Sequence, residues 1–169
     1  INFGIIYGMG PVRLAKELEI SHEDAVRTIA SYFERYAGVA EYVRRTIEEA
    51  RRAGYVTTLF GRRRPIPDLA SPEGGVRQFA ERVAVNTPIQ GTAADLIKKA
   101  MVAIDRRLAA SGTRAGMILQ VHDELLVEAP SEEAESVAAV VREEMEGAAE
   151  LAVPLVVEVG IGGNWAEIH

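Results

Sequence analysis

The sequence contains no cysteine, which excludes disulfide bonds and metal sites built from thiolates. No apolar run approaches the roughly 20 residues of a membrane span, and no charged segment precedes a signal-like apolar core. Internal repeats and low-complexity linkers are also missing. These absences indicate a cytoplasmic protein with no membrane partner, because a chain without cysteine fits a reducing compartment.

The 169 residues are 48% hydrophobic and 26% charged, as in a globular chain that can bury a core. Their net charge of −6 is unevenly distributed. Residues 1–114 carry 18 Lys and Arg against 13 Asp and Glu, whereas residues 115–169 carry one Arg against 12 acids. The basic part could bind phosphates while the acidic part faces water or metal. The alternative is that both are solvated helix faces.

Apolar residues at helical spacing predict several helices. Ser21 and Ser131 are expected to cap helices, and Gly54 is expected to follow the end of one. Pro88 should interrupt a helix because proline has no backbone N–H, and Thr92 should restart it.

Short β-rich segments predict a small antiparallel sheet. Residues 55–60, followed by Gly-Arg-Arg-Arg-Pro, predict a hairpin. Residues 116–121 and 125–129 predict two antiparallel strands joined at His-Asp-Glu, and residues 155–161 alternate like a last strand. The expected fold class is therefore α+β, rich in helices.

His122, Asp123 and Glu124 lie between two apolar segments. Hard divalent cations prefer oxygen ligands, and Mg²⁺ commonly uses one or two carboxylates together with substrate phosphates. A third ligand is not evident in the sequence, and no second His stands at the spacing of a zinc site. On these residues alone, a solvated polar turn is the alternative to a metal site.

Two further patterns have both a structural and a functional interpretation. Phe3 and Tyr7 are four residues apart, so on a helix their rings share one face, and spacing alone favours a place in the core. Arg62, Arg63 and Arg64 form the densest positive run, which is either a solvated turn or a contact to a nucleic-acid backbone.

Several motifs occur in one order along the chain. They are INFGIIYGMG (1–10), GYVTTLFGRRRPIPDL (54–69), NTPIQGTAADL (86–96), QVHDEL (120–125) and VEVGIGGNW (157–165). Together they resemble the bacterial DNA polymerase I family, the A-family polymerases, and the resemblance covers essentially the whole chain. The related single-subunit RNA polymerases would not be expected to carry this run of motifs.

The resemblance implies a right-hand fold of palm, fingers and thumb. It implies transfer of a nucleotide from a dNTP to the 3′-OH of a primer, directed by a template and assisted by two Mg²⁺ ions. Residues 1–53 would form fingers helices and residues 54–169 a part of the palm. The expected partners are primer–template DNA and dNTPs, and the expected state is a monomer.

The same resemblance assigns roles around the His-Asp-Glu motif. Asp123 would bind metal and be catalytic. Glu124 would be a weaker metal ligand, or would contact the metal's direct ligands without binding the metal itself. His122 would lie at the primer end.

Phe3 and Tyr7 match the fingers helix that closes over the incoming nucleotide, one ring towards the sugar and base and one towards the templating position. The resemblance also suggests that Phe3 disfavours dideoxynucleotides. This interpretation replaces the core placement that spacing alone favours.

The remaining matches concern DNA. Arg82, Asn86 and Gln90 would contact the duplex near the primer terminus, with capping of a helix as the alternative for Asn86. Amide and guanidinium donors suit the minor groove, whose acceptors occur on every correct pair. Arg64 is the best match for a contact to the backbone or the primer.

The sequence also departs from the family pattern. The family's other essential aspartate, and the Arg and Lys side chains that hold the triphosphate, would precede Ile1, and neither a thumb nor an exonuclease domain is evident. We therefore expect a fragment that is inactive alone. The competing hypotheses are a non-catalytic nucleic-acid-binding relative and, with too few ligands, a metal-dependent phosphohydrolase.

Overall fold

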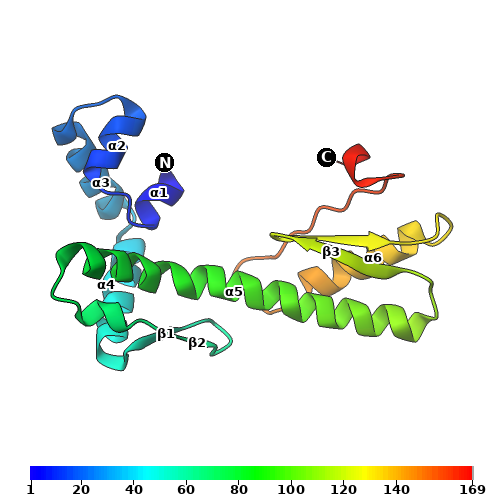
Figure 1. The fold of residues 1–169 in the computed structure, drawn as a ribbon. Helices are drawn as coiled ribbons and strands as arrows, with labels where there is room; N and C mark the ends of the chain where they lie inside the picture. Colours follow the sequence, from blue (N-terminus) through cyan, green and yellow to red (C-terminus); the bar gives the residue numbers. More distant parts are fainter. Residues whose placement is uncertain (169) are drawn as a thin grey trace. The chain divides into compact units, whose positions relative to one another are not determined.

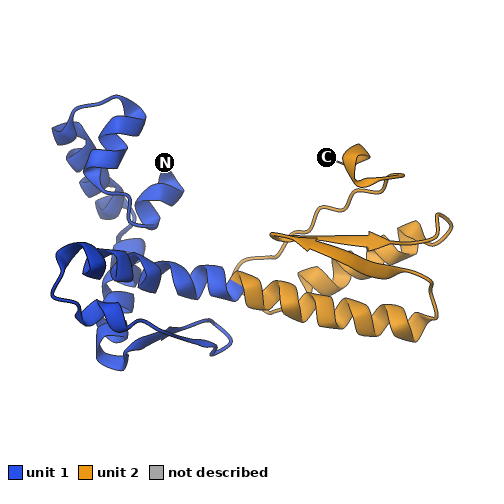
Figure 2. Ribbon diagram, in the orientation of Figure 1, with its two compact units in different colours: residues 1–92 blue, residues 93–169 orange. Residues whose placement is uncertain are grey.

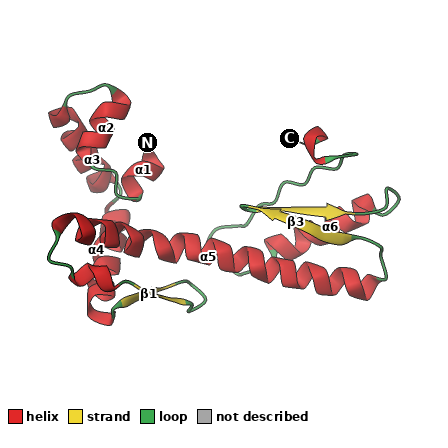
Figure 3. Ribbon diagram, viewed as in Figure 1, coloured by secondary structure: helices red, strands yellow, loops and turns green. Residues whose placement is uncertain are grey.

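The computed structural model describes residues 1–168 and divides into two compact units, Ile1–Thr92 and Ala93–His169 (Figures 1 and 2). Helices predominate, and the strands form two separate two-stranded antiparallel sheets (Figure 3). The predicted helix-rich α+β class is confirmed. The functional division into fingers helices (1–53) and a palm part (54–169) stays a prediction.

Unit 1 consists mainly of helices. Its elements are α1 (Asn2–Ile6), α2 (Pro11–Leu18), α3 (His22–Arg35), α4 (Ala37–Ala53), β1 (Tyr55–Thr57), β2 (Arg63–Pro65), the 3₁₀ turn η1 (Pro67–Ala70) and the first part of α5 (Gly74–Ser111). Ser21 caps α3 as predicted, because its hydroxyl oxygen accepts the Asp24 N–H at 3.0 Å. Gly54 ends α4 in the left-handed conformation, with a φ of +80°.

Two small cores stabilise unit 1. Ile5, Leu14 and Ala25 are buried together, so the short helix α1 is anchored to α2 and α3. A second cluster joins α4, the first hairpin and α5, and it consists of Ala50, Val56, Ile66, Leu69, Ala80 and Ala84. The hairpin that carries the arginine run is therefore packed against α5 through Val56.

The predicted β1–β2 hairpin is confirmed, with shorter strands than the sequence suggested. Tyr55 pairs with Pro65, and Val56 pairs with Arg64. The connection contains Gly61 at a φ of +81°, which a glycine adopts without steric cost. Arg62 lies in this connection, while Arg63 and Arg64 are on β2.

Unit 2 contains the rest of α5, the hairpin β3 (Gly116–Val121) and β4 (Glu124–Glu128), helix α6 (Ala134–Glu146) and the turn η2 (Trp165–Glu167). Its core lies between α5, the hairpin and α6. The buried residues of that core are Ala100, Ile104, Leu108, Val137 and Val141. The second predicted hairpin is confirmed, but Glu124 belongs to strand β4 and not to the turn.

The expected interruption at Pro88 is wrong. Helix α5 is continuous over 38 residues with Pro88 in its interior. Side chains donate hydrogen bonds to carbonyl groups that precede the proline and to its own carbonyl: Thr87 to Val83 at 2.6 Å, Tyr42 to Val85 at 2.9 Å and Thr92 to Pro88 at 2.5 Å. Apolar packing also continues in both directions, so tertiary contacts outweigh the bond that proline removes.

Two other expectations are wrong. Ser131 does not cap α6, whose first residue is Ala134; residues 130–133 form a turn instead, in which the Glu133 N–H bonds to the Pro130 carbonyl at 2.9 Å. Residues 155–161 form no strand, since no neighbouring strand pairs with them among the described residues. Within that segment, the Val157 N–H donates to the Glu146 carboxylate at 3.1 Å.

None of the helices within residues 1–168 combines the length and the apolar character that crossing a membrane requires.

Candidate functional site

His122 and Asp123 form the two-residue turn that joins β3 to β4, where Val121 pairs with Glu124. His122 has a φ of +54°, a left-handed conformation that few residues other than glycine adopt. The Gln120 side-chain amide donates to the His122 carbonyl at 2.9 Å and so braces this turn. The backbone that presents Asp123 is therefore held by its own hairpin.

Asp123 and Glu124 are both exposed, at the tip of the hairpin and at the first position of β4. As hard oxygen donors at an accessible turn, they fit Mg²⁺. Residues 1–168 contain no group of three or more His, Asp or Glu side chains that could hold a metal ion. The pair would therefore supply part of a coordination sphere, and its metal-binding and catalytic roles stay predictions.

The Phe3 and Tyr7 rings share one face, as their spacing predicted, and they stack with centroids 6.4 Å apart and planes inclined by 17°. Phe3 is 75% exposed, so it is not part of the packed interior of the described chain. Ile5 on the opposite side is only 2% exposed and fixes α1 to its core. Helix α1 therefore presents the Phe3 ring outwards, and the nucleotide-binding role of Phe3 and Tyr7 stays a prediction.

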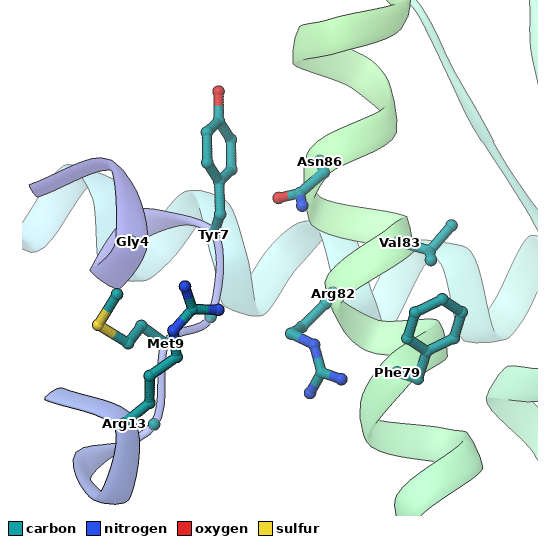
Figure 4. A pocket seen from close by; sticks show the side chains of 10 residues that line it. Gly4, Tyr7, Met9, Arg13, Phe79, Arg82, Val83 and Asn86 are labelled. Carbon is teal, nitrogen blue, oxygen red and sulfur yellow. The ribbon is translucent and has the colours of Figure 1, made fainter. Parts of the chain in front are cut away.

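A cavity of about 460 Å³, which Tyr7 lines, lies entirely within unit 1. Its lining comes from the α1–α2 segment and from α5, and it consists of Gly4, Tyr7, Gly8, Met9, Gly10, Arg13, Phe79, Arg82, Val83 and Asn86. Figure 4 shows Arg82 and Asn86 reaching from α5 towards the side that carries Tyr7 and Arg13. The structure thus brings three predicted site residues, Tyr7, Arg82 and Asn86, around one cavity.

Gly8 leaves room for the Arg82 side chain at the edge of this cavity. Its φ is +86°, and a Cβ atom there would lie 2.8 Å from Arg82 Cγ and 3.0 Å from Cδ. The Arg82 guanidinium carbon lies 5.7 Å from the centre of the Phe79 ring, a cation–π arrangement. The aliphatic stem and the charged end of Arg82 are therefore both positioned by neighbours.

Asn86 and Gln90 lie on the continuous helix α5, so neither leaves the helix at a break, and Asn86 does not cap a helix. Because Arg82, Asn86 and Gln90 are each four residues apart, they follow one face of α5. Asn86 Oδ1 is buried and has no hydrogen-bond partner among the described residues. Buried polar atoms normally have a partner, so this oxygen marks a position suited to an external donor.

Tyr42 supports α5 next to Asn86. Its hydroxyl donates to the Val85 carbonyl at 2.9 Å, and burial raises the pKa of the phenol. Helix α4 is thereby fixed to the residue that precedes Asn86.

Arg64 projects from β2 towards α5, where its Nη1 atom donates to Thr87 Oγ1 at 3.2 Å. Its neighbour Arg63 lies over the Tyr55 ring, 4.8 Å from the centre. The arginine run is therefore not a freely solvated turn, because each of these two side chains has a defined partner.

The sequence did not single out Met9, Arg13 or Phe79, which also line the cavity. Arg13 pairs with Glu17 at 2.9 Å across one helical turn. The only sequence signal was the cluster of glycines at positions 4, 8 and 10, which indicates a close approach of chains but not its partners. His122, Asp123 and Glu124 belong to unit 2.

A family model described as DNA polymerase family A matches residues 1–167. The chain belongs to DNA polymerase family A. Similar family members include the thermostable DNA polymerase I of Thermus aquaticus, 55% identical over 165 residues, and the DNA polymerase I of Pseudomonas aeruginosa, 51% identical over 169 residues. These alignments cover 98% and 100% of this chain, but 20% and 18% of the two polymerases. The chain thus spans about a fifth of their length.

A solved structure of the same family has the same fold. It is the POL domain of Pol1 from M. smegmatis in complex with DNA primer–template and dNTP, and the TM-score is 0.95 at 44% sequence identity. The match covers 99% of this chain and 30% of that chain. The family that the sequence motifs suggested is therefore confirmed.

Proposed function

We propose that this family A chain is the fingers and palm part of a DNA polymerase that adds deoxynucleotides to a primer under the direction of a template. The observation that carries the proposal is the fold match, over 99% of this chain, to a polymerase domain in complex with primer–template DNA and dNTP. The motifs that span residues 1–165 agree with it.

In this proposal, unit 1 binds the nucleotide and the duplex. The exposed ring of Phe3 contacts the sugar and base, and Tyr7 lies against the templating position at the cavity. Arg82, Asn86 and Gln90 donate to minor-groove acceptors from one face of α5, which tests pair shape without reading sequence. The row of donor-bearing side chains along one face of α5 supports this role.

The β3–β4 turn supplies the carboxylates. Asp123 holds Mg²⁺ with the help of Glu124, and His122 contacts the primer end. Two Mg²⁺ ions, when bound, would promote attack by the primer 3′-OH and stabilise charge on the phosphates. The exposure of the carboxylates and the bracing of the turn by Gln120 support these assignments.

The polymerase acts as a cytoplasmic monomer in DNA replication or repair. The cysteine-free sequence supports a cytoplasmic location.

The test is a primer-extension assay with the intact polymerase that carries this chain. We expect addition of only the dNTP complementary to the template, and no addition when EDTA removes divalent cations. A template with a different first base serves as the control, since the added nucleotide should change with it. Binding of primer–template without extension would favour the non-catalytic relative, and template-independent release of phosphate would favour a phosphohydrolase.

A further inference from the structure

Two threonines fasten the arginine-bearing hairpin to α5. Thr87 and Thr92 lie on the part of α5 that the hairpin covers, and each uses its hydroxyl in the same way. The hydrogen is donated to a carbonyl of α5 four residues earlier, and the oxygen accepts a donor from the hairpin.

Thr87 acts directly on Arg64. Its hydroxyl donates to the Val83 carbonyl at 2.6 Å, while its oxygen accepts Nη1–H of Arg64 at 3.2 Å. Thr87 is 8% exposed, so water has little access to compete for this oxygen. Because the hydrogen already points along the helix, the remaining lone pairs face the guanidinium.

Thr92 holds the other end of the hairpin. Its hydroxyl donates to the Pro88 carbonyl at 2.5 Å, and its oxygen accepts the Leu59 N–H at 2.9 Å. Close by, Arg62 Nη2 donates to the Gly91 carbonyl at 3.0 Å. A Cβ atom on Gly91 would lie 2.7 Å from Thr58 Cγ2, so a glycine is needed for the hairpin to reach the helix.

The consequence concerns the orientation of Arg64. Its side chain is exposed, and Thr87 accepts its one hydrogen bond within residues 1–168. Arginine has five N–H donors, so four remain to bind an anion after one is given to Thr87. Thr87 follows Asn86 in α5, so Arg64 is held at the helical turn that carries one of the proposed duplex contacts.

We propose that Thr87 and Thr92 are positioning residues that hold the Arg64 guanidinium for one phosphate of the bound duplex. The inference rests on the proposed function, and it adds the partner atom and the device that orients this arginine. Thr87 fixes the guanidinium itself, and Thr92 fixes the connection that leads into β2, the strand from which Arg64 projects.

The experiment uses the intact polymerase and a primer–template duplex at several salt concentrations. The double variant Thr87→Val with Thr92→Val keeps the side-chain shape and removes both acceptor oxygens. The double variant Thr87→Ser with Thr92→Ser keeps both hydroxyls and is the matched control. Each pair is also made in an Arg64→Ala background, and thermal unfolding of every protein is measured alongside.

The valine pair should weaken duplex binding about tenfold, the magnitude of one hydrogen bond to a charged group. It should also lower the slope of log Kd against log salt by about one, as expected when one phosphate contact is lost. The serine pair should bind like the wild type. In the Arg64→Ala background the valine pair should have no further effect on binding.

Overall destabilisation alone would lower the melting temperature and the fraction of molecules able to bind DNA. The slope of log Kd against log salt for the folded molecules would then be unchanged. If the double variant does not fold, the single variant Thr87→Val is measured in its place. An unchanged slope and Kd in a folded valine variant would overturn the inference, and so would an undiminished effect in the Arg64→Ala background. Failure of the proposed function is distinguishable, because the wild type itself would then fail to extend the primer.

Discussion

Gly8 shows how a single residue shapes the cavity in unit 1. Its positive φ turns the chain out of α1, and its missing side chain leaves room for the stem of Arg82. Tyr7 before it and Met9 after it both line the cavity. The conformation and the contact both require glycine. The backbone at this position therefore determines where Arg82, a proposed duplex contact, can lie.

Replacing Gly8 by Ala should therefore reduce both stability and DNA binding. A left-handed conformation costs a residue with a Cβ atom roughly 1–2 kcal/mol, and the new atom would displace Arg82. Chemical denaturation and primer–template titration of the intact polymerase measure the two effects. Gly38→Ala is the control, because no atom lies within 4 Å of the added group; equal behaviour of the two variants would contradict the argument.

Phe3 offers a test of nucleotide contact that does not involve stability, since its ring is 75% exposed. If the ring faces the sugar of the incoming nucleotide, Phe3→Tyr should increase the use of dideoxynucleotides relative to deoxynucleotides. The ratio of the two incorporation rates in the intact polymerase is the measurement. An unchanged ratio would argue against a contact between Phe3 and the sugar.

Individual site residues were predictable from the sequence only through motifs. Tyr7, Arg82 and Asn86 were chosen on that basis, and the fold brings them to one cavity. The contributions of Arg13 and Phe79 were not predictable, because each depends on which helix the α1–α2 segment packs against. Likewise the partner of Arg64, Thr87, is 23 residues away, and no local pattern joins them.

At the scale of elements, local signals succeeded where the end of an element depends on its own residues. Ser21 begins α3, Gly54 ends α4, and the hairpins form where β-rich segments flank short connections. Local signals failed where tertiary contacts determine whether a helix continues or a strand forms. Pro88 remains inside α5 because neighbouring side chains bond the surrounding carbonyls, and residues 155–161 alternate in sequence without a strand to pair with.

The cap of α3 gives an element-scale prediction. Ser21→Ala should cost about 1 kcal/mol of stability, since the Asp24 N–H loses its acceptor. Thermal and chemical unfolding measure the loss. Ser31→Ala, at an exposed position inside the same helix, is the control and should be neutral or slightly stabilising; a loss of equal size there would contradict a capping effect.

The same cap predicts a dependence on pH. The Ser21 hydroxyl and the Arg27 guanidinium lower the pKa of Asp24 in the folded state. A carboxyl group with a lowered pKa stabilises the fold above its unfolded pKa, and this contribution disappears as the pH falls through the folded value. The stability difference between the wild type and Ser21→Ala should therefore shrink in acid.

At the scale of the whole molecule, each unit has its own core, and the proposed site residues are divided between the units. Phe3, Tyr7 and the duplex contacts belong to unit 1, while the His-Asp-Glu hairpin belongs to unit 2. Residues 1–168 contain no group of three or more His, Asp or Glu side chains that could hold a metal ion, so Asp123 and Glu124 do not form a complete metal site there. The basic part of the sequence coincides largely with the proposed DNA contacts, and the acidic part contains the carboxylate turn.

We therefore predict that the 169-residue chain alone does not extend a primer, although the intact polymerase does. Both proteins would be assayed at equal concentration with the same primer–template, dNTPs and Mg²⁺. Circular dichroism of the isolated chain serves as the control for folding. Processive synthesis by the isolated chain would contradict the prediction.

The central claim is that the carboxylate of Asp123 holds the catalytic metal, and single-turnover nucleotide addition by Asp123→Asn in the intact polymerase tests it most directly. Asp105→Asn is the matched control, because Asp105 is an exposed aspartate on α5 of the same unit. The account predicts that Asp123→Asn loses addition by about a thousandfold or more while primer–template affinity is retained, and that Asp105→Asn behaves like the wild type. Addition by Asp123→Asn at the rate of the wild type would contradict it.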